Sequence, residues 1–162
     1  MTTLHLGVVD IPYAQAPKKL RRKAGKTPNE TTGDVAEILE DKYGVMEKFF
    51  EHNEQFIADQ LENSVAGALE TMLMSKGQGL TDIIGAGLSR TFEEGAGEIK
   101  EKFTSFLETR EVEALGIGGV PTKAALKGVN HRLKHPYASS NPRRPSFIDT
   151  SLYQQSFKCW VD

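Results

Sequence analysis

The sequence has little of several residue types, and each shortage excludes a class of protein. Cys159 is its one cysteine, so no disulfide can form within the chain, which is typical of proteins from a reducing compartment. No apolar run approaches the roughly 18 residues of a membrane span, and no hydrophobic segment follows Met1. We therefore expect a soluble single domain that is made in the cytoplasm, without a signal peptide or a spanning helix.

Sequence motifs for catalysis or cofactor binding are also missing. The stretch Gly116–Lys123 contains glycines and a lysine, but not the spacing or the Gly-Lys-Ser/Thr end of a phosphate-binding loop. His131 and His135 stand four residues apart, yet Pro136 would end a helix there and no carboxylate or cysteine lies beside them. Cys159 lies among aromatic residues near the end of the chain, where it is expected to pack as a small hydrophobic residue. We expect no enzymatic activity, no cofactor and no metal.

Charge is strongly segregated along the chain, although the net charge is only −2. Residues 30–70 contain eleven acidic residues against two lysines, and residues 123–144 are basic without any acid. An earlier basic arm and the end of the second basic block supply the cations that we predict to make electrostatic contacts: Lys18, Lys19, Arg21, Arg22, Lys23, Arg143 and Arg144. Blocks of opposite sign suit a chain that lies against copies of itself, and they are equally compatible with solvated faces.

Two long stretches have apolar residues at spacings of three and four, which predicts amphipathic helices. The first runs from Val35 to Leu73 with a bend near Gly44, and the second runs from Leu80 to about Leu115. The short glycine-containing connection between them predicts an antiparallel pair. Thr31 or Thr32 is the expected N-cap of the first helix, and residues 120–128 are expected to contain one short helix.

β-strands are expected only near the two ends of the chain. Residues 3–11 are β-prone, and the best partner within the chain is Ser156–Val161, while pairing with a neighbouring subunit is equally open. Asp149 or Thr150 is the expected N-cap of a turn just before that segment. The predicted fold class is α+β and helix-dominated, with a long antiparallel helix pair, short strands and extended terminal arms. The predicted parts are a strand and basic arm (1–30), a helical core (31–115), and a hinge, basic loop and docking segment (116–162).

The last twenty residues are unusually rich in aromatic side chains, including the single tryptophan. A chain end normally frays unless it is held in place, so this density predicts docking on the chain's own core or on a neighbouring subunit. The predicted subunit-interface residues are Phe147, Asp149, Thr150, Leu152, Tyr153, Phe157 and Trp160.

The segment Phe147–Phe157 is similar to the Pro-x-Asp-Thr-Gly-x-Leu-x-x-Ser pattern of neck and tail-completion proteins of tailed bacteriophages, with Ser151 in place of the glycine. Residues 31–43 and 119–128 also resemble phage virion proteins of this kind, so the resemblance covers roughly residues 31–162. It implies a non-enzymatic virion subunit of a homo-oligomeric ring at the head–tail junction, assembled in the host cytoplasm. The implied partners are copies of the chain, other neck or tail proteins and, non-specifically, passing DNA.

Two alternatives stay open at this point. Within the virion, the chain could be a baseplate or sheath-associated tail subunit. From another class, the basic segments suit a DNA-binding packaging accessory protein, because phosphate contacts need only lysine and arginine.

Overall fold

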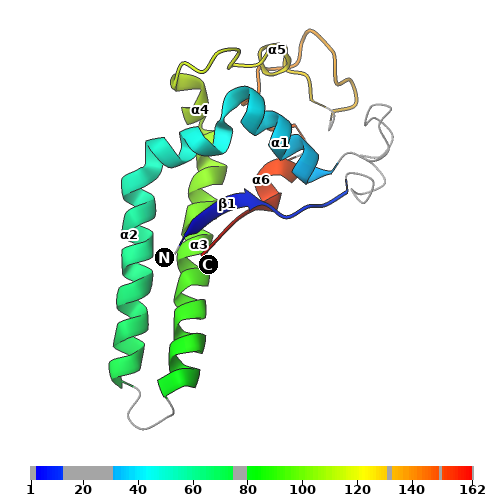
Figure 1. The fold of residues 1–162 in the computed structure, drawn as a ribbon. Helices are drawn as coiled ribbons and strands as arrows, with labels where there is room; N and C mark the ends of the chain where they lie inside the picture. Colours follow the sequence, from blue (N-terminus) through cyan, green and yellow to red (C-terminus); the bar gives the residue numbers. More distant parts are fainter. Residues whose placement is uncertain (1–2, 13–30, 75–79, 131–132, 150, 162) are drawn as a thin grey trace.

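Two long helices lie side by side and form an elongated hairpin (Figure 1). They belong to a computed structural model that describes residues 3–12, 31–74, 80–130, 133–149 and 151–161. Helix α2 spans Val45–Met74 and helix α3 spans Leu80–Glu108. Together with two short strands, these helices confirm the predicted α+β, helix-dominated class and the antiparallel helix pair.

The hairpin helices approach each other closely through small residues. A Cβ atom on Gly95 of α3 would lie 2.5 Å from the Ser64 Oγ atom and 3.3 Å from the Gln60 carbonyl oxygen. Ser64 and Ala68 are buried on the facing side of α2. The glycine therefore has a packing reason that outweighs its low helix propensity.

The first predicted helical region is divided in two by the bend at Gly44. Helix α1 spans Thr32–Tyr43 and begins at a capping box, in which Thr31 and Asp34 hydrogen-bond each other's backbone N–H at 2.9 and 3.2 Å. Gly44 ends α1 in the left-handed region with φ 59°, where glycine carries no steric penalty. A second kink, at Asn53 inside α2, was not predicted; its side-chain amide donates to the Phe49 carbonyl over 2.9 Å.

The second predicted helical region ends earlier than its periodicity indicates. Helix α3 stops at Glu108, Arg110 adopts φ 66°, and a separate short helix, α4, covers Glu111–Ala114. The predicted short helix is α5, Lys123–Leu126, with Thr122 as its N-cap. The last helix, α6, spans Leu152–Ser156 and begins at Ser151, so the predicted cap at Asp149 or Thr150 is wrong.

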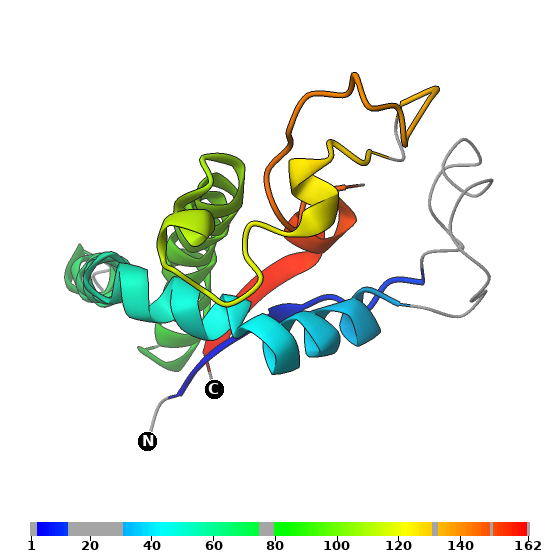
Figure 2. The same ribbon diagram turned by 90° about the horizontal axis from the view of Figure 1, so that it is seen from above.

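The two ends of the chain pair with each other. Strand β1, Leu4–Val8, is antiparallel to β2, Phe157–Val161, with Leu4 opposite Val161 and Val8 opposite Phe157. This confirms the pairing within the chain that the sequence suggested. The ribbon runs alongside α3 (Figures 1 and 2), and Cys159 is buried there with its Sγ atom 3.6 Å from the Ala96 carbonyl oxygen.

A cluster of aromatic rings forms the centre of the core. Phe103 of α3 stacks on Phe157 of β2, with ring centroids 4.1 Å apart, and meets Phe49 of α2 edge-on at 5.1 Å. Phe106 and Tyr153 complete the cluster, with Tyr153 5.8 Å from Phe103. One ring set thus joins both hairpin helices to the C-terminal segment, and each buried ring adds apolar area and edge-to-face contacts.

Candidate assembly surface

An exposed apolar stripe runs along the far half of α2. Val65, Leu69 and Leu73 are 44%, 52% and 81% exposed, and the next residue, Met74, is 86% exposed. The first three are spaced four residues apart, so they lie on one face of the helix. The adjacent face of the helix, at Ser64 and Ala68, packs on α3. This half of the hairpin extends away from the rest of the molecule (Figure 1), and nothing described within the chain covers the stripe.

Two acidic side chains lie beside this stripe. From Phe49 to Met74 the sequence contains no lysine or arginine. Glu62 and Glu70 are exposed on the same half of α2, and neither forms an ion pair with the parts of the chain that the structure describes. An apolar strip with acidic side chains beside it has the composition of a protein interface with a charged rim. Three exposed apolar residues on one face form a patch, which single scattered hydrophobic residues do not.

The predicted interface residues of the C-terminal segment lie mainly against the chain's own core. Tyr153 and Phe157 are buried in the aromatic cluster, and the Phe147 ring lies 5.1 Å from that of Tyr43. Trp160 stacks on His5 at 5.3 Å and is 44% exposed. Three residues remain: Asp149 and Leu152 line a cleft beside α1, and Thr150 lies outside the described residues. The aromatic terminus therefore docks within the chain, and Trp160 is its most exposed ring.

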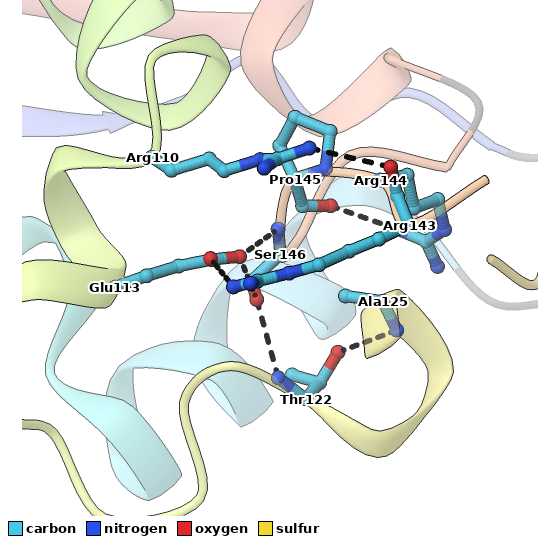
Figure 3. Close-up of polar contacts among 8 residues, drawn as sticks. All are labelled: Arg110, Glu113, Thr122, Ala125, Arg143, Arg144, Pro145 and Ser146. Carbon is cyan, nitrogen blue, oxygen red and sulfur yellow. Dashed lines mark hydrogen bonds and ion pairs between the residues drawn. The ribbon is translucent and has the colours of Figure 1, made fainter. Parts of the chain in front are cut away.

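A polar network fixes the loop that contains the two predicted arginines (Figure 3). The Glu113 carboxylate accepts hydrogen bonds from the Ser146 N–H at 2.9 Å and the Ser146 hydroxyl at 2.7 Å, and it pairs with Arg143. The Ser146 hydroxyl oxygen accepts in turn from the Thr122 N–H at 3.2 Å. The Arg110 guanidinium donates to the Arg143 carbonyl over 3.2 Å. The network joins α4, the N-cap of α5 and the loop into one unit.

Arg144 is used inside the chain as well. Its guanidinium donates to the carbonyl oxygens of Val129, Pro145 and Ile148. Its partial burial lowers the pKa of the guanidinium, while Asp149 acts in the opposite direction. Arg143 and Arg144 thus both bind groups within the chain and hold the loop in place. The predicted arm cations at positions 18–23 and His131 lie outside the described residues.

A cleft of about 300 Å³ lies between α1, α5 and α6, and Tyr153 is part of its wall. Its hydroxyl is buried without a hydrogen-bond partner among the described residues. Burial, and secondarily the nearby charge of Glu40, raises the pKa of this phenol. A buried hydroxyl without a partner costs desolvation energy with no hydrogen bond in return, and burial opposes its ionisation at high pH.

Replacing Tyr153 with phenylalanine should change the free energy of unfolding at pH 7 by less than about 1 kcal/mol, because no hydrogen bond is lost. The folded pKa is raised, so unfolded Tyr153 ionises above pH about 10 while the folded side chain stays neutral. Wild-type stability should therefore fall from pH 8 to 11, and the variant should lose less over the same interval. Denaturant titrations at both pH values measure this, with Tyr137→Phe, at a 72% exposed position, as control. Equal losses in wild type and Tyr153→Phe would contradict the assignment.

Comparison with family models, with curated proteins and with solved structures gives no match to this chain. Within the described ranges, no helix combines the length and apolar content needed to cross a bilayer, and no three potential metal ligands converge.

The stripe on α2 was missed as a site at the level of sequence, because its residues fit the same apolar period as the buried ones. The sequence signal that could have indicated it is the segment 49–74, which contains Val65, Leu69 and Leu73 together with several acidic residues and no lysine or arginine.

Proposed function

We propose that this chain is a non-enzymatic structural subunit of a tailed-phage virion, part of a neck or tail-completion ring built from copies of itself and attached to other neck or tail proteins. The observation that carries the assembly role is the stripe of Val65, Leu69 and Leu73 on the projecting part of α2. A folded chain that leaves three aligned apolar side chains in water gains stability when a partner covers them.

The virion setting is supported by the local structure of the phage-like segment. Residue 151, glycine in the phage pattern and serine here, adopts φ 61°, a left-handed conformation that favours glycine. The turn leads directly into α6 and then into β2. The backbone conformation at Ser151 thus gives a physical reason for the glycine of the pattern.

A second candidate, a DNA-binding packaging accessory protein, is favoured by one specific observation. Lys123 on α5 and Lys127 at its C-cap are exposed, close to the basic loop 133–144. Non-specific DNA affinity through such lysines decreases steeply as salt rises, whereas assembly through apolar side chains persists. Salt dependence therefore separates the two candidates.

The test is size exclusion with light scattering at low and high salt, followed by negative-stain imaging of each peak. The wild-type chain should form rings at both salt concentrations. Leu69→Ser/Leu73→Ser should shift the protein to monomer by raising Kd at least about a hundredfold, because each lost leucine contact is worth about 1.5–3 kcal/mol. Ile38→Ser, at a 58% exposed position on α1, is the matched control and should assemble like the wild type. A monomeric wild type, or a double variant that still forms rings, would contradict the proposed assembly.

A further inference from the structure

Two separate surfaces of the described chain carry charged side chains without an ion pair, and one of them is on α5. There, Leu126 is 50% exposed, and Lys123 at the start of the helix and Lys127 at its C-cap are exposed beside it. Neither lysine forms an ion pair with any part of the chain that the structure describes. By contrast, Arg143 pairs with Glu113 and Lys102 pairs with Glu111. We call Lys123, Leu126 and Lys127 the α5 patch; the other surface is the stripe on α2 with the acidic side chains beside it.

The α5 patch is held rigidly although its helix has only one turn. The Ala125 N–H donates to the Thr122 hydroxyl over 3.2 Å, and the Ala125 side chain is fully buried. The Ala125 carbonyl accepts from the Arg144 N–H at 3.1 Å. Gly128 follows with φ 63°, and a Cβ atom there would lie 2.4 Å from the Pro142 carbonyl oxygen. The exposed side chains of the patch therefore project from a fixed backbone, which reduces the ordering entropy that binding costs.

The two surfaces lie toward opposite ends of the molecule. The stripe is near the tip of the hairpin, whereas α5 lies beyond its other end (Figure 1). One chain therefore cannot bring its own stripe and α5 patch together. A contact between them must join two copies, and repeating it adds further copies in the same direction.

The two surfaces carry opposite charges, and the long lysine side chains can bridge the difference in their spacing. Glu62 and Glu70 are separated by two helical turns, about 12 Å along the axis, with Val65 and Leu69 between them. Lys123 and Lys127 are separated by about 6 Å, and their long side chains can reach outward to both carboxylates. Leu126 would then lie on the apolar stripe, beside these ion pairs.

Two stripes facing each other would be a poorer arrangement. That contact would bring the carboxylates of two α2 helices together, and α2 has no lysine or arginine after Lys48 to neutralise them. Like charges across an interface oppose association, and opposite charges set register and partner choice. We propose that the stripe of one copy binds the α5 patch of the next copy in a head-to-tail contact. This inference rests on the proposed function, and it names the partner of the stripe.

Charge reversal in the full-length chain tests the contact. Variant one is Glu62→Lys/Glu70→Lys, and variant two is Lys123→Glu/Lys127→Glu. Each alone should elute as a monomer at concentrations where the wild type assembles, because each places like charges across every contact. An equimolar mixture should assemble again, since each surface then meets an opposite charge on the other variant. Circular dichroism melting checks that both variants fold.

Lys42→Glu, at an exposed position on α1, is a matched control that should leave assembly unchanged. The inference is overturned if the wild type assembles and both reversals assemble equally well, or if the folded variants stay monomeric after mixing. In both cases the proposed ring function survives. A wild-type chain that remains monomeric at every concentration overturns the contact and the ring together.

A further experiment uses cysteine pairs in a Cys159→Ser background. Mixed Leu69→Cys and Leu126→Cys chains should form a disulfide-linked heterodimer under mild oxidation. Its yield should be at least tenfold greater than the yield of either homodimer. Predominant Leu69→Cys homodimer would show stripe-to-stripe packing and would overturn the head-to-tail contact. The contact is also overturned if variant two loses binding to random-sequence duplex DNA but assembles like the wild type, because the lysines would then serve phosphate contacts.

Discussion

Phe103→Ala should lower the free energy of unfolding by about 3–5 kcal/mol, the usual cost of deleting a fully buried aromatic ring. Phe103 is 0% exposed and contacts Phe49, Tyr153 and Phe157, so its loss opens a cavity between α2, α6 and β2. A domain of ordinary stability has about 5–15 kcal/mol in total, so the variant should be close to unfolding at 37 °C. Chemical denaturation followed by circular dichroism measures the difference.

Phe50→Ala is the matched control for this substitution. Phe50 adjoins Phe49 on α2 but is 39% exposed, and it makes no ring contact with the cluster of Phe103. Its replacement should cost about 1 kcal/mol or less, as for most surface positions. A Phe103→Ala variant that loses no more stability than Phe50→Ala would mean that the rings are not the centre of the core.

Much of the fold follows from local sequence signals. The capping box at Thr31, the left-handed Gly44 and the β-prone ends each act through neighbouring residues, so the sequence reveals them. The breaks at Asn53 and Arg110 do not carry such signals. Asn53 is buried and bonds the Phe49 carbonyl, so the kink depends on packing around it. Tertiary context overrides helix propensity at both positions.

The candidate site was only partly predictable for the same reason. Aromatic density at the end of the chain predicts docking, but composition cannot distinguish docking on the chain's own core from docking on a neighbouring subunit. The structure places Phe157 in the chain's own core. Arginine count predicts electrostatic contacts, yet Arg144 binds three carbonyls of its own loop. The stripe at Leu69 can be recognised only from the structure, in which no other described element covers it.

Glu113→Ala should destabilise the chain by about 2–4 kcal/mol, although it removes a carboxylate from a short four-residue helix. The Glu113 side chain is only 6% exposed, and Ser146 is fully buried. Without the carboxylate, the Ser146 N–H and hydroxyl lose their acceptor, and each unsatisfied buried donor costs about 1–3 kcal/mol. The Arg143 pair adds little to this loss, because the Arg143 side chain is 42% exposed and its charge is screened by water.

Two further variants separate the buried hydrogen bonds from the charge. Glu113→Gln keeps one acceptor oxygen and should recover more than half of the stability that Glu113→Ala loses. Glu111→Ala, two residues earlier on α4, removes partly solvated contacts to Lys102 and His52, at 3.4 and 3.8 Å, and an exposed hydrogen bond from the Thr109 hydroxyl at 3.1 Å. It should cost about 1 kcal/mol or less, because water replaces all three contacts. Urea titrations of the three variants give the ranking.

If Glu111→Ala costs as much as Glu113→Ala, the Ser146 hydrogen bonds do not hold the loop to α4. If the predicted ranking holds, Glu113 is the residue that fixes the loop behind α5 and thereby orients Lys123, Leu126 and Lys127.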